Sequence, residues 1–377
     1  VERLHGAALA LLEEPGIFSD SAAMRDIFRR GGARVDDTAQ TIHVPPELVS
    51  EALGSAPSSF IVHGRDPEMD LLLEAGRVYY GMGGTSEPFF WDYETGRPRT
   101  PTTTDMVNAT RVGQALSHVD FIMALCSAGD CPRDVAFFYE YDAIFRNTTK
   151  PVVVSSLGRR SVARFLEMAA AASSGEEEFR RRPWVIVYVT PISPLQATRL
   201  NEGMIEAAHY GCPIQYSPAP LLGATGPVNL RGQLIQATAE ALFGLVTSQL
   251  IKPGTPFIYA PHMPAMDMRT TQVTYASAEQ AVGRAVVAQF GHYYNLPTFN
   301  TGAGCDAKLP DAAAAAEAMF GMLLNALAGM ILTQCMGTLQ AACMDHLRCW
   351  SSAMSWCGWW RAPWRASRRP TTMIWLS

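Results

Sequence analysis

The sequence predicts a (β/α)8 TIM-type barrel with a small N-terminal α+β cap, and three observations support this fold class. From residue 79 onward, strand-like runs rich in β-branched residues alternate with helical patterns. The alternation gives eight strands over about 260 residues, which is the usual size of such a barrel. No Gly-x-Gly-x-x-Gly turn follows the first run, and its absence disfavours the alternative, an open doubly wound sheet.

The cap is predicted over residues 1–78. Apolar positions at helical spacing indicate a first helix that stops at Pro15-Gly16. A later helix is expected to start at Pro45-Pro46, because proline suits the first helical turn. The predicted helices are residues 1–14, 21–30 and 45–52, and the short β-type runs are residues 60–64 and 77–80.

The barrel is predicted over residues 79–339, with strands that each lead into a polar loop and then a helix. In folds of this kind the loops after the strands carry the chemistry. The predicted strands are residues 79–82, 119–126, 151–157, 184–190, 213–217, 256–260, 298–301 and 330–336. The helical patterns include residues 161–173, 199–210, 230–251, 277–294 and 311–328.

Residues 340–377 do not fit this pattern. Six of the eight tryptophans and five arginines fall after Leu339, without an amphipathic period. The codons of residues 343–346, read two bases later, can encode Tyr-Gly-Ser, and the same frame continues through Trp356 as a helix-like sequence. We therefore predict that Gln340 to Ser377 is an out-of-frame tail and not a domain, caused by one nucleotide lost near codon 340. A genuine Trp-rich tail is the alternative, and resequencing across codons 336–345 distinguishes the two.

The composition narrows the class of protein. The net charge of −5 and the pI near 5.9 give no basic surface for nucleic acid or anionic lipid. No apolar run is expected to reach the roughly 18 residues of a membrane helix. The eight cysteines are scattered without paired spacing, so reduced thiols and a cytoplasmic location are expected.

The first candidate site follows the first barrel strand. Gly83 and Gly84 would let the backbone approach a ligand. Glu87 beside Phe89 and its aromatic neighbours would suit a methylammonium cation, through a countercharge and π faces. The alternative is that the glycines only form a turn and that the aromatic side chains only pack in the core.

Further candidates follow other strands. Ser193 lies in a proline-rich loop after the most strand-like run of the chain, and Ser217 ends the next strand. Each could hydrogen-bond a substrate or could belong to a merely rigid loop. The run Thr298–Thr301 leads into two glycines and then Cys305, Asp306 and Lys308. Gln334 lies in the last strand. Together with His262, these residues complete the set of candidate site residues.

The histidines do not predict a metal site. No pair among the eight has the spacing of a helical or hairpin zinc site. His262 and Asp267 follow one strand while Cys305 and Asp306 follow the next, which leaves a mixed metal site open on geometry. We expect His262 to be a loop or substrate-pocket residue and expect no metal ligands.

Taken together, three motifs resemble the trimethylamine methyltransferase family. They are Gly83-Gly84-Thr85 with Asp92-Tyr93-Glu94-Thr95-Gly96, then Thr190-Pro191-Ile192-Ser193-Pro194-Leu195, then Gly302-Ala303-Gly304-Cys305-Asp306-Ala307-Lys308. The resemblance runs from about residue 1 to Leu339. The founding archaeal members use pyrrolysine, and this chain shows none, so it is similar to the non-pyrrolysine branch that includes glycine betaine methyltransferases.

The resemblance implies a barrel that moves a methyl group from a methylated, quaternary amine to the cobalt of a separate corrinoid protein. No cofactor would be bound tightly, because the corrinoid (cobalamin) arrives with the partner. Glu87 and Asp306 are then the candidate catalytic residues, with Asp306 and Lys308 facing a polar or carboxylate end of the substrate. A metal-dependent barrel hydrolase or lyase and a non-catalytic quaternary-amine-binding barrel remain the alternatives. A homo-oligomer is compatible with general trends.

Overall fold

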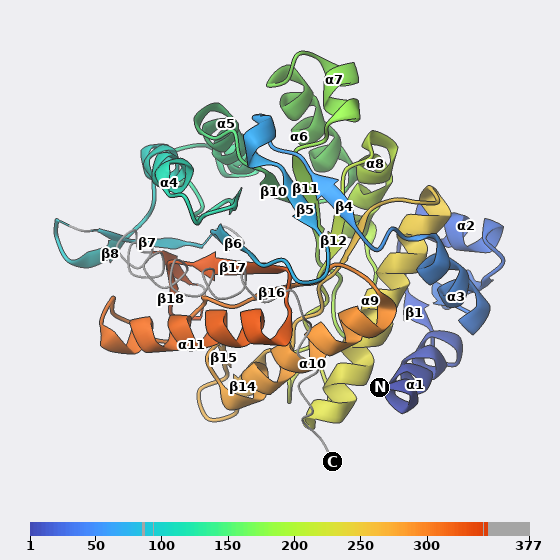
Figure 1. The fold of residues 1–377 in the computed structure, drawn as a ribbon. Helices are drawn as coiled ribbons and strands as arrows, with labels where there is room; N and C mark the ends of the chain where they lie inside the picture. The colour runs from blue at the N-terminus through green and yellow to red at the C-terminus, as the bar shows by residue number, and fades with distance from the viewer. Residues whose placement is uncertain (85–86, 93, 342, 346–377) are drawn as a thin grey trace.

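The predicted barrel is present in the computed structural model, which describes residues 1–84, 87–92, 94–341 and 343–345 (Figure 1). Its eight parallel strands neighbour one another in chain order, and β17 pairs with β6. A parallel bridge between Tyr259 and Thr298 joins the two remaining edges, so the ring is nearly closed. The strands are β6 (Tyr79–Met82), β9 (Phe121–Met123), β10 (Val152–Ser155), β11 (Val185–Val189), β12 (Ile214–Tyr216), β13 (Phe257–Tyr259), β16 (Phe299–Thr301) and β17 (Leu332–Met336). All eight predicted strands are therefore confirmed.

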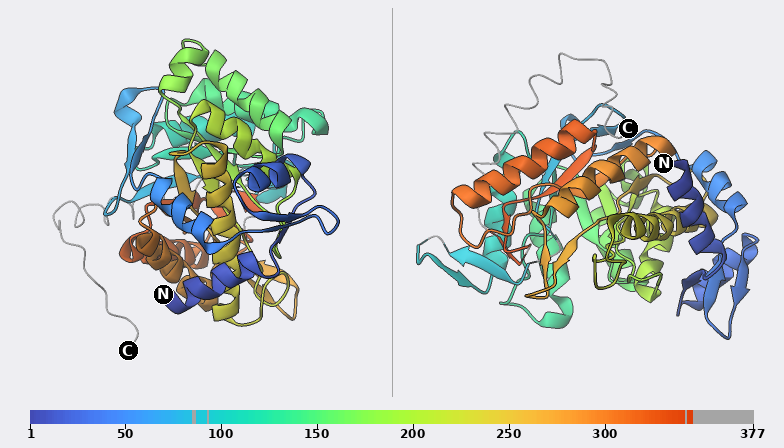
Figure 2. Two further views of the ribbon diagram at one scale, coloured as in Figure 1. Left: turned by 90° about the vertical axis from the view of Figure 1, so that its right-hand side faces the viewer. Right: turned by 90° about the horizontal axis from the view of Figure 1, so that it is seen from below.

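Helices surround this sheet, and four of them, α4, α9, α10 and α11, begin at a side-chain cap (Figures 1 and 2). Thr102 caps α4 reciprocally with Asp105, and Asn229, Ser277 and Asp311 cap α9, α10 and α11. The helices are α4 (Thr103–Ala115), α5 (Ala136–Asn147), α6 (Arg159–Ala171), α7 (Glu176–Arg181), α8 (Gly203–Tyr210), α9 (Leu230–Ile251), α10 (Ala278–Tyr294) and α11 (Ala312–Ala328). Two short 3-10 turns, η2 (Arg133–Val135) and η3 (Arg199–Glu202), precede α5 and α8.

The N-terminal segment packs on the outside of the barrel against α9 (Figure 2). Its elements are α1 (Glu2–Glu13), β1 (Ile17–Phe18), α2 (Ala22–Arg30), β2 (Arg34–Asp36), β3 (Thr41–His43) and α3 (Pro46–Ser55). The three predicted helices are therefore present as α1, α2 and α3. Phe28 stacks on Phe243 with ring centroids 4.5 Å apart. One continuous apolar core joins this segment to the barrel helices. The division into a cap (1–78) and a barrel (79–339) stays a prediction.

Helix α9 corrects one expectation from the sequence. By length and composition it is long and apolar enough to cross a membrane, although no such run was expected. However, 83% of its apolar window is buried inside the fold, under α1 and α3. Its hydrophobicity is therefore explained by its position in the core.

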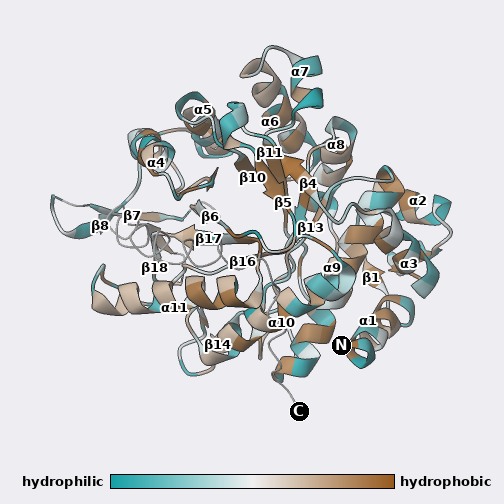
Figure 3. Ribbon diagram, in the orientation of Figure 1, coloured by the Kyte–Doolittle hydropathy of each residue, from teal (hydrophilic) through white to brown (hydrophobic). Residues whose placement is uncertain are grey.

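A hairpin of β4 (Phe60–Val62), η1 (Pro67–Met69) and β5 (Leu71–Leu73) closes the N-terminal end of the barrel. It packs against an inner cluster of large apolar side chains that we call the floor: Phe121, Met123, Val153, Ile186, Ile258, Phe299 and Leu332. Gly81 is required here, since a Cβ on it would lie 2.1 Å from the Phe121 ring. The β-type run expected at 77–80 is the start of β6. Figure 3 shows hydrophobic residues gathered along the central strands.

Short strands lie at the opposite, C-terminal end of the barrel. They are β7 (Phe89–Asp92), β8 (Arg97–Arg99), β14 (Ala265–Asp267), β15 (Gln272–Thr274), β18 (Thr338–Leu339) and β19 (Met344–Asp345). Arg99 fastens the β7–β8 hairpin to α4 by ion pairs with Asp92 and Asp105, both at 2.7 Å. Most of the predicted out-of-frame tail, Gln340–Ser377, lies outside the described residues, and that prediction stays untested.

Candidate active site in the barrel mouth

Polar side chains occupy inward positions near the carboxyl ends of β11, β12 and β17. Along β11, Val187 and Val189 belong to the outer core, while Tyr188 packs on the floor cluster inside the barrel. Tyr188 is the register partner of Gln215 in β12, so both side chains face the interior. Gln334 is the register partner of Thr301. We call this polar layer above the floor the mouth.

The two glutamines of the mouth use their amides differently. Gln334 is 2% exposed, and its Nε2 donates to the carbonyl oxygen of Gly83 at 3.0 Å, which ties the end of β17 to the end of β6. Gln215 is 0% exposed, and neither its amide nitrogen nor its amide oxygen has a hydrogen-bond partner within the described residues. A buried amide without partners costs stability, so this arrangement needs an explanation.

Glu87 enters the mouth from the loop after β6. Its side chain is buried (2% exposed), and its backbone N–H donates to the carbonyl oxygen of Leu125 at 3.0 Å. Glycine at position 84 makes room for the carboxylate, because a Cβ there would lie 1.9 Å from Oε1 of Glu87. Gly83 has a φ of +84°, and a Cβ on it would meet the carbonyl oxygen of Met123 at 2.2 Å. The two glycines are thus required by close approach, as the motif suggested.

Tyr275 lies in the loop between β15 and α10, within range of the charge of Glu87. Burial raises the pKa of Tyr275, and the charges of Cys335, Tyr188 and Glu87 add to the effect. Burial also raises the pKa of Tyr188, which lies beside Thr190 and Ser217. Cys335 adopts a φ of +72°, which is rare for a residue other than glycine and marks local strain next to this cluster.

Two basic side chains complete the mouth. Burial lowers the pKa of His262 to about 4, with Asn300 opposing the change, so the imidazole is neutral near pH 7. Burial likewise lowers the pKa of Arg284 to about 10. Nη2 of Arg284 donates to the carbonyl oxygen of Tyr275 at 2.6 Å, and the guanidinium therefore positions the Tyr275 loop.

Several predicted site residues instead have bonds that hold the scaffold together. Both carboxylate oxygens of Asp306 accept backbone N–H groups, from Tyr275 at 2.7 Å and Ala276 at 2.9 Å. Cys305 is buried in a small apolar cluster, and its Sγ donates to the carbonyl oxygen of Thr338 at 3.1 Å. Asp306 thus positions the Tyr275 loop, and the catalytic role expected for it stays a prediction.

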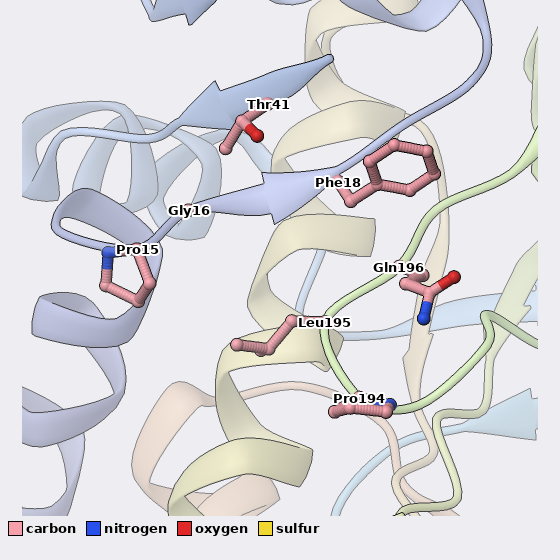
Figure 4. A pocket seen from close by; sticks show the side chains of 7 residues that line it. All are labelled: Pro15, Gly16, Phe18, Thr41, Pro194, Leu195 and Gln196. Carbon is pink, nitrogen blue, oxygen red and sulfur yellow. The ribbon is translucent and has the colours of Figure 1, made fainter. Parts of the chain in front are cut away.

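Ser193 is likewise occupied, as its hydroxyl donates to Glu240 in α9 at 2.6 Å. The same carboxylate accepts the N–H of Leu195 at 2.9 Å, and burial raises its pKa. Pro194 and Leu195 line a surface groove of about 460 Å³ between this loop and the N-terminal β1 and β3 (Figure 4). The Ser193 loop therefore links the barrel to the N-terminal segment.

Two further candidates lie at the surface. Lys308 is exposed, and no hydrogen bond or ion pair joins it to another described residue. Phe89 is 49% exposed on β7. Neither placement supports substrate contact. The structure thus brings together Gly83, Gly84, Glu87, Ser217, His262 and Gln334, and leaves Phe89, Ser193, Cys305 and Lys308 in other surroundings.

The mixed metal site that the sequence left open does not form. Asp267 is engaged in its own turn, where it accepts from the backbone N–H of Arg269 at 3.0 Å and from the hydroxyl of Thr270 at 2.8 Å. No three His, Cys, Asp or Glu side chains in the described part of the chain gather as metal ligands.

Sequence reasoning missed Tyr188, Gln215, Tyr275 and Arg284. For two of them a signal was present: a strand buried on both faces should be apolar throughout, and Tyr188 and Gln215 interrupt such strands. Tyr275 and Arg284 carry no comparable local signal.

Comparison with known proteins decides the family. Residues 1–344 match the family model described as trimethylamine methyltransferase (MTTB). The chain belongs to this family. The resemblance drawn from the motifs is therefore confirmed.

Three curated relatives illustrate the range of the family. Trimethylamine methyltransferase MttB of Desulfitobacterium hafniense (strain DSM 10664 / DCB-2) is 34% identical over 330 residues, covering 86% of this chain and 66% of the relative. MttB of Methanosarcina barkeri (strain Fusaro / DSM 804) is 29% identical, covering 87% and 67%. The glycine betaine methyltransferase of D. hafniense (strain Y51) is 27% identical, covering 86% and 67%. The chain thus spans about two thirds of the length of these relatives.

Proposed function

We propose that this chain is an enzyme that removes a methyl group from a quaternary amine and passes it to the cobalt of a corrinoid carried by a separate protein. The observation that carries the proposal is the buried carboxylate of Glu87 in the barrel mouth, whose charge also acts on the phenol of Tyr275. Membership of a family whose named relatives act on trimethylamine or glycine betaine supports it.

A permanently charged ammonium fits this setting. A buried carboxylate is stabilised by a positive charge close to it, and the cation of a bound substrate would add such a charge beside Glu87. The faces of Tyr275 and Tyr188 would attract the same cation through their ring quadrupoles. Because methyl groups on nitrogen donate no ordinary hydrogen bonds, charge and π faces are the main means of holding that end of the substrate.

The chemistry asks for little proton transfer by this chain. The quaternary nitrogen already carries its positive charge, so it leaves as a neutral tertiary amine without a proton donor. The corrinoid, when the partner brings it, supplies a strong nucleophile in its reduced state. The residues of this chain bind the cation at Glu87, exclude water around the Tyr188 and Tyr275 rings, and fix the end of β6 through Gln334.

The test is methyl transfer to cob(I)alamin, followed by its absorbance change, with a panel of methylated amines. We expect methylcobalamin with a quaternary amine, and we expect Glu87→Gln to lower kcat/KM by at least about tenfold through loss of the countercharge. Glu94→Gln, a matched change in an exposed turn, should leave the rate unaltered.

The same assay should be run on the present chain and on a chain with the reading frame restored after codon 340. Substrate binding without methyl transfer in both would favour the non-catalytic barrel. Activity that depends on added zinc or iron and yields another product would favour the metal-dependent hydrolase or lyase. Either result would overturn the proposal.

A further inference from the structure

Gln215 is a polar group that the proposed methyl transfer leaves without a role. It lies in the middle of β12, between Ile214 and Tyr216, whose side chains pack outward in the core. Its own side chain faces the interior, is 0% exposed, and has both amide atoms without partners among the described residues. A buried amide that makes no hydrogen bonds destabilises the fold, so a fold that keeps this residue calls for a compensating partner.

The neighbours of Gln215 define where such a partner would sit. Tyr188 is its register partner on one side, and Ile258 of the floor is its partner on the other. Ser217 follows two residues later on the same inner face, next to the Tyr188 hydroxyl. Gln215 therefore marks the inner end of the mouth, directly above the floor.

Glu87 marks the outer end. It lies beyond the end of β6, in the loop that bridges to Cys126, whereas Gln215 lies within a strand. A substrate held by both residues would place its methylated nitrogen toward the opening and its other end toward the floor. This orientation presents a methyl group to an acceptor that arrives from outside.

We propose that Gln215 binds the hydrogen-bonding tail of the substrate, at the end remote from the methylated nitrogen, and so selects tailed quaternary amines over those that carry only alkyl groups. The inference rests on the proposed function, because that function supplies the cation at Glu87. The amide offers two N–H donors and a carbonyl acceptor, so it can serve a carboxylate or a hydroxyl tail. Tetramethylammonium has no tail and cannot use it.

The test compares three ligands by titration calorimetry on the full chain: glycine betaine, choline and tetramethylammonium. We expect Gln215→Leu to weaken glycine betaine and choline by about tenfold or more and to change tetramethylammonium by less than about twofold. Glu87→Gln should weaken all three. Gln272→Leu, an exposed change of the same kind in β15, should weaken none.

A charged replacement adds a second contrast and guards against misfolding of the first variant. Gln215→Glu keeps the size of the side chain but places a carboxylate beside the tail, so glycine betaine should lose far more affinity than choline. Equal losses for all three ligands in both variants, or no loss in either, would overturn the inference. If instead Glu87→Gln left every affinity unaltered while the Gln215 contrast held, the proposed role of Glu87 would fail and the tail site would stand.

Discussion

At the N-terminal end of the barrel interior, Phe121, Ile186 and Leu332 pack tightly against the β4–β5 hairpin. At the C-terminal end, the same inward positions of the strands carry Tyr188, Gln215 and Gln334, which leave hydrogen-bonding atoms of both amides unused. The residues of the floor thus stabilise the fold, whereas the mouth contains residues that destabilise it. A polar group retained at such a cost indicates a binding role, and substitutions of a floor side chain and of Gln215 should therefore change stability in opposite directions.

The largest effect is expected in the floor. Phe121→Ala removes a fully buried ring (0% exposed) and leaves a cavity that the closed barrel cannot fill, so the free energy of unfolding should fall by about 3–5 kcal/mol. Urea denaturation followed by circular dichroism measures the change. Phe89→Ala, on the exposed side of β7, is the matched control and should cost less than about 1 kcal/mol. Similar losses for both would contradict the role given to the floor.

The next effect appears with pH and concerns His262 in the mouth. Its pKa falls from 6.5 to about 4 in the folded chain, so the unfolded chain binds more protons between these values. Stability is then fully present above about pH 6.5 and is lost as the pH falls toward 4, by up to about 3 kcal/mol. Urea denaturation at pH 7 and pH 4.5 should show this loss in the parent chain and a smaller loss in His262→Gln. Parallel pH profiles would show that His262 is not the source.

A smaller effect is expected at Glu240, which supports the loop after β11. Glu240→Ala leaves the Ser193 hydroxyl and the Leu195 N–H without their acceptor, and should cost about 2–3 kcal/mol of unfolding free energy. Glu240→Gln retains an acceptor, and burial already disfavours the charged form of this carboxyl, so it should cost about 1 kcal/mol or less. Thermal melts of the two variants compare them directly. A larger loss in the Gln variant would mean that the charge itself stabilises the loop.

The fold could be predicted from the sequence because strand and helix signals repeat along it. Runs such as residues 152–154 are apolar on both faces, as a covered parallel strand requires, and capping residues such as Asn229 and Asp311 precede long helical patterns. The hairpin β4–β5 was only half anticipated. Its second strand, Leu71–Leu73, is three consecutive leucines without alternation, and its role depends on a floor distant in the sequence.

The site was harder to predict, because loop motifs and ligand contacts are different things. Ser193 and Asp306 stand out in the sequence, yet their polar atoms satisfy a buried carboxylate and two backbone N–H groups. Such bonds depend on where α9 and the Tyr275 loop lie in space, which local spacing does not reveal. Glu87 and Gly84 could be predicted from the sequence because the contact between them is local.

The smallest effect is expected at Gln215, with the opposite sign. Gln215→Leu replaces an unsatisfied amide by an apolar side chain of similar size next to the floor, so the free energy of unfolding should rise by about 1 kcal/mol and the melting temperature by about 1 °C. Differential scanning calorimetry in the absence of any methylated amine measures this, with the exposed Gln272→Leu as control.

An unaltered or higher stability of Gln215→Leu, together with weaker binding of tailed amines, is the signature of a residue kept for its ligand. A loss of more than about 1 kcal/mol would instead mean that the amide stabilises the barrel itself, and the contrast between floor and mouth would not hold at β12. Glycine betaine should also raise the melting temperature of the parent chain more than that of the variant, because at a given ligand concentration the stabilisation is greater for the chain that binds the ligand more tightly. That comparison separates a binding role from a packing role in one experiment, since only the binding role makes the difference between the two chains depend on ligand concentration.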